Sequence, residues 1–254
     1  KSLSKALGFD FKRIQFTPDM MPADVTGFYA YSPDGSSRFI EGPIFADVVL
    51  ADELNRTTPR TQAALLEAMQ EKQVTVEKNT YPLSQHFMVI ATQVESGSEG
   101  TYSITDVQMD RFILRALSKY PSKEEEKQII TNIDSIDEPD VNVITTLDEI
   151  RELQMLAKRV EVSPDIAEYI VSFIELLRQD NDILSGPSSR CSIALYKCSR
   201  VLALLDGRDF VIPDDVKRLI FSATEHRIKI KPEAEMDDVT PRAVLERILE
   251  QVAV

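Results

Sequence analysis

The sequence predicts an α/β domain with a mainly parallel sheet, followed by a domain made of helices alone. The stretch 46–56 has an apolar run, Val48 to Ala51, that is short enough for a buried strand and ends in two adjacent carboxylates, Asp52 and Glu53. Helical spacing of apolar residues follows at 60–71, so strand, acidic turn and helix come in the order typical of open α/β sheets. Beyond Pro121 the regular segments all have helical spacing. A mixed part followed by helices indicates two domains.

The first domain is expected at 1–120, and its elements can be assigned in order. Residues 1–7 have the pattern of the end of a helix, with Gly8 as its C-terminal cap. Hairpins are predicted where turn-forming residues separate two strand-like runs. The further elements are a strand at 11–16, a loop with a short helical piece at 17–27, a hairpin of 29–31 and 38–40 around 32–36, the strand–turn–helix unit at 46–71, a hairpin of 73–77 and 80–83 around 78–79, a strand at 87–92, a mobile loop at 95–103, a helical turn at 106–110 and a strand at 112–120.

The second domain is expected at 121–254 and to be all-α. Pro213 and Pro241 lie near helix starts, where proline is favoured because its missing N–H has no partner to lose. Helices are predicted at 123–132, 147–159, 164–179, 189–206, 213–227 and 241–252. A chain of 254 residues is long enough for two domains with separate cores.

Composition excludes several classes of protein. The net charge of −13 disfavours general binding to nucleic acid or anionic membranes, and no apolar run approaches the roughly 20 residues that cross a bilayer. Cys191 and Cys198 share one helical pattern about 10 Å apart, too far for a disulfide, so two buried free thiols are expected. His86 and His226 lack zinc-ligand spacing and are expected to be structural. These features favour a reducing, cytoplasmic location.

Asp52 and Glu53 are the strongest candidates for chemistry. Two neighbouring acids at a strand end suit a divalent cation and an activated water, because one carboxylate can hold Mg²⁺ while the other orients the nucleophile. The alternative is a strand-end turn with two solvated acids. The pair alone does not decide between them.

Five stretches, taken in order, resemble the MoxR family of AAA+ ATPases and together run through essentially the whole chain. They are Phe16-Thr17-Pro18-Asp19 with Pro22-Ala23-Asp24 and Gly27, then Gly42-Pro43-Ile44-Phe45-Ala46 leading into Asp52-Glu53-Leu54-Asn55-Arg56, then 64–71 with 73–76, then Gly100-Thr101-Tyr102 with 108–112, and finally Gly186-Pro187-Ser188-Ser189-Arg190. The second resembles the family's Walker-B segment and the last its sensor-2 motif. Each stretch alone is a weak signal, whereas five in order are specific.

The resemblance implies an AAA+ αβα sandwich of the P-loop type, an all-α lid, and ATP bound between them and a neighbouring subunit. Asp52 is then expected to hold Mg²⁺ and Glu53 to polarise the attacking water. Arg190 is expected to reach the phosphates from the lid of the same subunit; a single arginine on a lid helix is otherwise a surface residue.

The resemblance also implies contacts between subunits. Arg111 is the candidate arginine finger, inserted in trans, and its alternative is a salt bridge to Asp110 or another acid. Arg56 could contact the adjacent subunit. The first hairpin corresponds to the helix-2 insert of this clade and the second to the hairpin before sensor 1. In related motors such hairpins face the centre of the ring, where they can touch a substrate or partner; here they could equally be decoration of the sheet edge.

The chain departs from the family pattern in two places. The phosphate-cradling P-loop is missing, and Lys1–Leu7 fits the back half of the helix that follows it, so the P-loop is expected upstream and this fragment to be inactive. Sensor 1 of the family has an asparagine where this chain has Val94. Either Thr92 or Gln93 replaces its function, or the loop is rearranged around 97–98, and hydrolysis could be slow.

Three functions are compatible with this sequence. The first is an ATP-driven, homo-oligomeric and hexameric ATPase that remodels or activates client proteins, such as von Willebrand A-type domain proteins or metal-containing enzymes awaiting their cofactor. The second is a catalytically weak AAA+ scaffold, favoured by the missing P-loop and Val94. The third, a helicase-like motor, conflicts with the net charge of −13.

Overall fold

The computed structural model describes residues 1–94, 99–137 and 139–252, and it divides into two compact units. The sheet unit contains Lys1–Gln108 and Pro121–Leu147, and the helical unit contains Met109–Tyr120 and Asp148–Val254. The expected boundary at residue 120 is one of the places where the chain passes between units. The chain also crosses at 108 and at 147, so each unit is built from two segments.

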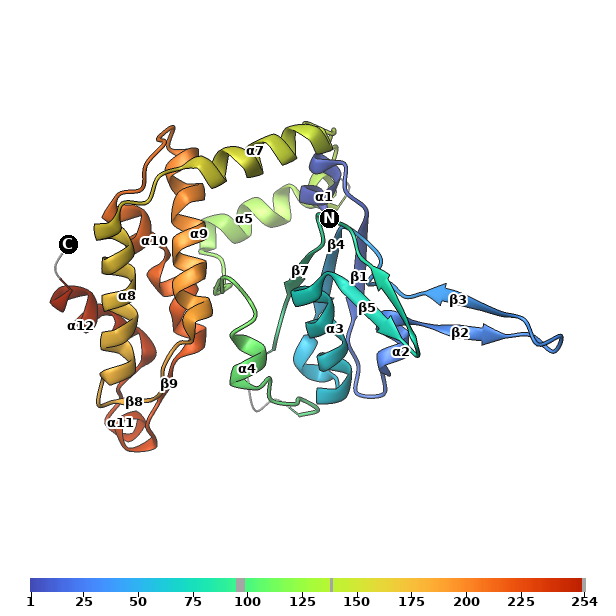
Figure 1. Ribbon diagram of the computed structural model, residues 1–254, viewed down its shortest axis with the longest axis horizontal. Helices are drawn as coiled ribbons and strands as arrows, with labels where there is room; N and C mark the ends of the chain where they lie inside the picture. The colour runs from blue at the N-terminus through green and yellow to red at the C-terminus, as the bar shows by residue number, and fades with distance from the viewer. Residues whose placement is uncertain (95–98, 138, 253–254) are drawn as a thin grey trace. The chain divides into compact units, whose positions relative to one another are not determined.

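Three parallel strands form the central sheet of the sheet unit (Figure 1). Their order is β1 (Phe11–Gln15), β4 (Val48–Asp52) and β7 (Met88–Ala91). Strand β4 lies between the other two, and its residues Val48, Val49 and Ala51 are buried, which explains its nearly unbroken apolar sequence. The register pairs Gln15 with Asp52 and Ala51 with Ala91. The carboxyl ends of all three strands therefore meet at one edge of the sheet.

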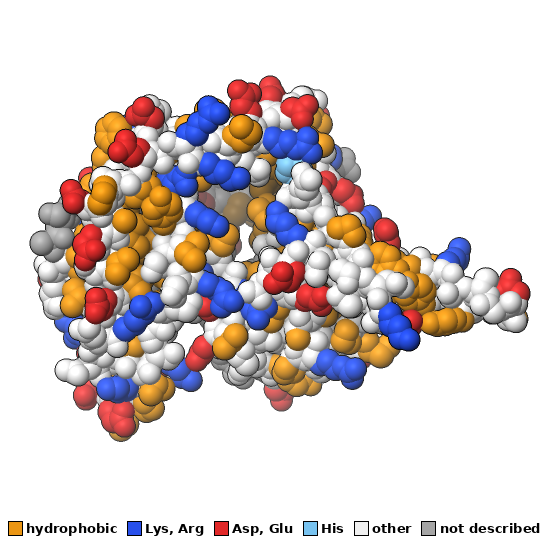
Figure 2. Space-filling view, in the orientation of Figure 1, with side chains coloured by type: hydrophobic (Ala, Val, Ile, Leu, Met, Phe, Trp, Pro, Cys, Tyr) orange, Lys and Arg blue, Asp and Glu red, His pale blue; other side chains and the backbone are white. Residues whose placement is uncertain are grey.

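Both predicted hairpins are confirmed. The first pairs β2 (Gly27–Tyr31) with β3 (Ser37–Glu41), and the second pairs β5 (Gln73–Val76) with β6 (Asn79–Pro82). The ring of Phe39 on the first hairpin stacks on that of Tyr81 on the second at 4.2 Å, and the hydroxyls of Tyr29 and Tyr81 are hydrogen-bonded. Figure 2 shows hydrophobic side chains gathered at the base of the β2–β3 hairpin, where it extends from the rest of the sheet unit.

Short helices complete the sheet unit. As predicted, α1 (Ser2–Leu7) ends at Gly8, whose positive φ of 68° is accessible to glycine without strain. Helix α3 (Pro59–Glu71) buries Thr61, Leu65 and Ala68 along one face. The remaining short helices are α2 (Pro22–Thr26), a 3₁₀ turn at Leu54–Arg56, α5 (Lys123–Thr131) and α6 (Ile133–Asp137), and α4 (Asp106–Met109) lies where the chain first passes between units.

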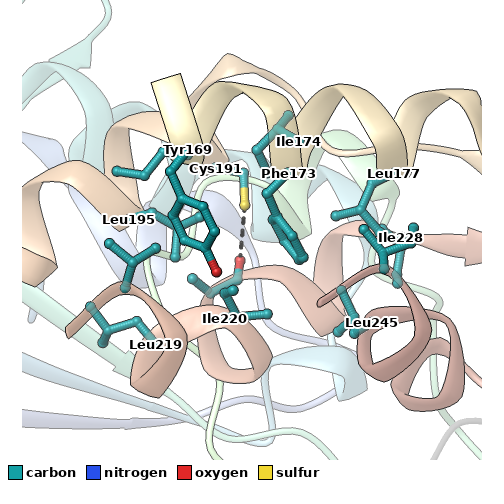
Figure 3. Close-up of a cluster of buried hydrophobic side chains, with 14 of the residues drawn as sticks. Tyr169, Phe173, Ile174, Leu177, Cys191, Leu195, Leu219, Ile220, Ile228 and Leu245 are labelled. Carbon is teal, nitrogen blue, oxygen red and sulfur yellow. Dashed lines mark hydrogen bonds between the residues drawn. The ribbon is translucent and has the colours of Figure 1, made fainter. Parts of the chain in front are cut away.

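The helical unit is organised around one buried apolar cluster (Figure 3). Phe173 and Leu177 of one helix pack with Leu195, Ile220 and Leu245, each from a different helix. The helices are α7 (Leu147–Arg159), α8 (Pro164–Gln179), α9 (Ser189–Leu205), α10 (Pro213–Thr224) with a 3₁₀ turn at Glu225–Arg227, α11 (Pro232–Met236) and α12 (Pro241–Gln251). All six helices predicted after residue 121 are present, with ends differing by a few residues.

Several predictions about single elements were wrong. Residues 112–120 form no strand, because the carbonyls of Phe112 and Ile113 accept hydrogen bonds from the Arg227 side chain instead of from a neighbouring strand. The second part of the chain is not all helical, since β8 (Ile183–Ser185) pairs with β9 (Lys229–Ile230). Helices α6 and α11 were not predicted, because five residues each are too few to show helical periodicity.

Both cysteines are free, as predicted, but only Cys191 is fully buried and Cys198 is half-buried. The expected mobile loop at 95–103 includes residues 95–98, which lie outside the described part of the chain. Among the described residues, no helix is both long and apolar enough to cross a membrane.

Candidate functional site at the end of the central strand

The acidic pair lies at the carboxyl end of β4, in a tight turn between the strand and the 3₁₀ turn that follows. Glu53 has a positive φ of 55°, which is uncommon for a residue with a side chain. Its backbone N–H donates to the Thr92 hydroxyl at 2.8 Å. The Thr92 hydroxyl therefore fixes the backbone of the turn at Glu53.

Asp52 is held as a carboxylate by two partners. Its Oδ1 accepts from the Thr92 hydroxyl at 2.5 Å, and its Oδ2 accepts from Arg13 Nη2 at 2.5 Å and Nε at 3.0 Å. The Thr92 hydrogen bond, followed by the Arg13 guanidinium, holds the pKa of Asp52 below its usual value despite opposition from burial. Asp52 is therefore ionised at neutral pH.

Glu53 is oriented from two sides. Its Oε2 accepts from Gln15 Nε2 at 3.0 Å and lies 2.9 Å from Arg56 Nε. Arg56, predicted to be a residue that could contact the adjacent subunit, thus contacts Glu53 of its own chain. About a third of the Glu53 side chain is exposed, at 34%, so the carboxylate stays within reach of a water molecule or ligand.

The segment after β7 holds the acidic pair in place through hydrogen bonds. Thr92 uses one hydroxyl to accept from the Glu53 N–H and to donate to Asp52, so a single side chain fixes both acids. Val94 is held through its backbone, since Asn55 Nδ2 donates to its carbonyl at 3.0 Å and its N–H donates to Asn55 Oδ1 at 3.1 Å. Gln93 lies between them and is exposed. Residues 97–98, invoked as a cause of rearrangement, lie outside the described residues.

Sequence reasoning missed Arg13 and Gln15. They are alternate residues of β1, so their side chains point to the same face of the sheet, next to the end of β4. The signal was present in the strand-like alternation at 11–16, but only the parallel pairing of β1 with β4 shows which acids they meet.

The donor set at this edge fits Mg²⁺. That ion is commonly bound by one or two carboxylates with waters and phosphate oxygens, and not by a cage of protein ligands. In keeping with this, the described residues contain no group of three or more His, Cys, Asp or Glu side chains placed to hold a metal. Asp52 Oδ2 already faces a cation, the guanidinium of Arg13, whose side chain is 57% exposed.

The other predicted site residues belong to the helical unit. Arg190 is in the first turn of α9, and its Nη1 donates to Asp110 Oδ2 at 3.2 Å. Arg111 directly follows Asp110 in the chain and is half-buried. Asp110 also accepts from the Ser188 hydroxyl at 2.7 Å and from Arg227 Nε at 3.0 Å. The structure therefore brings the segment carrying Arg111 to the end of α9 that carries Arg190.

Comparisons with known proteins agree with this architecture. The family model described as "ATPase family associated with various cellular activities (AAA)" matches residues 1–114, and the AAA lid domain model matches residues 175–248. The protein YeaC of Bacillus subtilis is 41% identical, over 100% of this chain and 80% of its own. The chaperone MoxR1 of Mycobacterium tuberculosis is 35% identical, over 100% of this chain and 70% of its own.

A solved structure has the same fold. The crystal structure of a candidate ATPase from Cytophaga hutchinsonii matches with a TM-score of 0.91 and 35% sequence identity, covering 99% of this chain and 80% of that one. The α/β class with a parallel sheet and a helical lid, predicted from the sequence, is confirmed.

Proposed function

The chain belongs to the MoxR family of AAA+ ATPases, and from this premise we propose that the full-length protein binds ATP with Mg²⁺ and hydrolyses it at the carboxyl end of β4. The observation that carries the proposal is the Thr92 hydroxyl, which joins the carboxylate of Asp52 to the backbone of Glu53. A solvated turn with two unrelated acids would need no such connection. The connection fixes the Asp52 carboxylate relative to the Glu53 backbone, and a hydrolytic site requires such fixed positions.

Each acid has its own role in this proposal. Asp52 holds Mg²⁺, which when bound neutralises charge on the phosphates of ATP. Glu53 accepts a hydrogen bond from a water molecule and so directs the oxygen of that water at the γ-phosphorus. As the new P–O bond forms, the bond between the γ-phosphorus and the bridging oxygen breaks, ADP leaves with that electron pair, and Glu53 receives the water's proton. Gln15 and Arg56 limit the rotation of Glu53.

Two arginines complete the site. We assign Arg190 to the phosphates of the same subunit as sensor 2, and Arg111 to the ATP of a neighbouring subunit as the arginine finger. A finger supplied in trans requires assembly, so we propose a homo-oligomeric ring, with six subunits as the family expectation. Arg56 forms an ion pair with Glu53. A contact between Arg56 and the neighbouring subunit would then change the position of the catalytic acid.

We propose that hydrolysis drives chaperone-like remodelling of a client protein in the cytoplasm. The relative named chaperone MoxR1 supports this, as do the aromatic side chains shared by the two hairpins. Tyr31 is 68% exposed and Phe28 is 50% exposed, which is a natural surface for a folded protein client such as a von Willebrand A-type domain. The net charge of −13 disfavours nucleic acid as the client.

A second candidate is a catalytically weak scaffold. Arg13 occupies Asp52 Oδ2 at 2.5 Å, where a metal would have to compete with it, and Val94 stands where the family has an asparagine. In a scaffold, this ion pair would be permanent and the acids would only tie the sheet edge together.

Steady-state ATP turnover of the natural full-length protein distinguishes the two. We expect Glu53→Gln to lower kcat by about 10²-fold or more while ATP affinity changes by less than about threefold, because only the water-activating carboxylate is lost. The matched control is Glu71→Gln at the exposed end of α3, which should leave kcat unchanged. Equal turnover by wild type and Glu53→Gln, or no turnover by wild type, would contradict the ATPase proposal.

A further inference from the structure

Arg227 is a buried arginine in the 3₁₀ turn that follows α10. Only 2% of its side chain is exposed, which is costly for a charge unless every donor is satisfied. All five of its N–H groups have acceptors. Nε donates to Asp110 Oδ1, Nη2 to the carbonyls of Asp110 and Phe112, and Nη1 to the carbonyls of Ile113 and Ala223.

Four of these five bonds reach a single irregular segment, 110–113. Within it, the Phe112 carbonyl accepts from Arg227 Nη2 at 2.6 Å and pairs with His226 Nε2 at 3.0 Å. The backbone N–H of Arg115 donates to the Ser222 carbonyl at 2.8 Å, which extends the attachment. A segment without its own helix or strand is therefore given a fixed shape by the end of α10.

The same segment is tied to the start of α9 through Asp110. Its Oδ1 accepts from Arg227, while its Oδ2 accepts from the Ser188 hydroxyl at 2.7 Å and from Arg190 Nη1 at 3.2 Å. Ser188 is the N-cap of α9, because its hydroxyl also accepts from the Arg190 N–H. One carboxylate thus links the buried arginine to the helix end that bears Arg190.

We infer that Arg227, acting through Asp110 and the backbone of 110–113, is a positioning residue that holds Arg111 and Arg190 at a fixed separation. This inference rests on the proposed function, in which Arg111 acts on the ATP of one subunit and Arg190 on that of another. Arg111 and Arg190 are both attached to the group formed by Arg227, Asp110 and the backbone of 110–113. When Arg190 shifts on binding phosphate, Arg111 of the same chain therefore shifts with it. The clamp thereby couples neighbouring sites in the ring.

A charge-conserving substitution tests the clamp. Lysine keeps the positive charge of Arg227 but has three donors and no planar fork, so it cannot satisfy the same acceptors. We expect Arg227→Lys to lower kcat by roughly 10- to 100-fold, with the KM for ATP within about threefold, because the finger acts in the transition state. The matched control is Arg208→Lys. Arg208 also forms two hydrogen bonds to a buried aspartate, Asp215, in the same unit. Arg208→Lys therefore weakens a comparable pair and destabilises the fold without changing the contacts of 110–113.

The deciding measurement is a double-mutant cycle with Arg111→Ala. If Arg227 acts through Arg111, then Arg227→Lys should cause no further loss of kcat in the Arg111→Ala background, whereas Arg208→Lys should leave kcat within about twofold in either. If the double variant loses kcat by the product of the two single losses, the clamp is wrong. Equal losses of kcat in Arg227→Lys and Arg208→Lys would also overturn the clamp, while leaving the proposed function standing. A wild-type protein without turnover would instead contradict the proposed function. In that case, amide hydrogen exchange of 110–113 that is the same in wild type and Arg227→Lys would overturn the clamp as well.

Discussion

At the scale of single residues, the Thr92 hydroxyl organises the candidate site, since it contacts both acids. Thr92→Val keeps the shape of the side chain but removes its hydrogen bonds, leaving the Glu53 N–H without its acceptor and Asp52 without its donor. We expect kcat for ATP to fall about 10- to 100-fold in Thr92→Val and to stay within a few-fold of wild type in Thr92→Ser. Equal turnover by the two variants would show that the hydroxyl is not needed.

His226 makes stability depend on pH. Burial lowers its pKa to about 4, with the charges of Arg227 and Arg115 acting in the same direction and against the hydrogen bond to Phe112. The unfolded chain therefore binds a proton near pH 6.5, whereas the folded chain does not until about pH 4. Stability is complete above pH 6.5 and is lost as pH falls toward 4.

The size of this effect can be measured in denaturant. Between pH 7 and pH 5, the linkage relation gives a loss of about 2 kcal/mol in the free energy of unfolding from His226 alone. His226→Gln cannot titrate and can still donate to the Phe112 carbonyl, so its stability should fall by that much less over the same interval. Parallel curves for wild type and variant would contradict a neutral, buried His226.

At the scale of elements, the start of α10 depends on Asp215, whose side chain is 1% exposed. It accepts from Arg208 at 2.7 and 2.8 Å and caps the helix by accepting from the Ile212 N–H at 3.0 Å. Burial alone would raise the pKa of Asp215, but these bonds outweigh it and lower the pKa. Removing the carboxylate leaves the Arg208 charge without its main partner.

We expect Asp215→Ala to lower the free energy of unfolding by about 3 kcal/mol. The control is Asp214→Ala in the same turn, where the side chain is 76% exposed and its ion pair with Lys217 is long, at 3.8 Å; we expect a loss below about 1 kcal/mol. Denaturant unfolding of both variants provides the test. Similar losses would mean that burial of the pair does not matter.

Elements with strong local signals could be predicted from the sequence, and those that depend on distant partners could not. The run 48–51 and the turn 32–36 carry their own information, in apolar continuity and in turn-forming residues. Residues 112–120 resemble a strand locally, but the carbonyls of Phe112 and Ile113 accept hydrogen bonds from the Arg227 side chain. An arginine at the end of a helical pattern has the appearance of a surface residue, so neither its burial nor its role could be inferred.

The same distinction holds for the candidate site. Asp52 and Glu53 could be identified because they follow an apolar run and match a family motif. Arg13 and Gln15 could not, because their contact with the acids arises from the parallel pairing of two strands separated by more than thirty residues. The sequence indicated which residues are candidates for the chemistry, while the structure was needed to show what orients them.

At the scale of the whole molecule, we propose that each ATP is hydrolysed by Glu53 of one subunit with Arg111 of another. Glu53→Gln and Arg111→Ala should each retain only a small residual kcat alone. When they are mixed, a subunit with intact Glu53 can meet a neighbour with intact Arg111. In rings assembled at random from equal amounts, about a quarter of the sites combine the two.

The most direct test is therefore ATP turnover by this mixture, with mixed assembly verified by co-purification of differently tagged subunits. We predict clear recovery of activity, up to about a quarter of wild type, whereas Glu53→Gln mixed with the Glu53→Gln, Arg111→Ala double variant stays at the residual level. Mixed assemblies that form but hydrolyse ATP no faster than the single variants would contradict a site shared between the β4 acids and a neighbour's arginine.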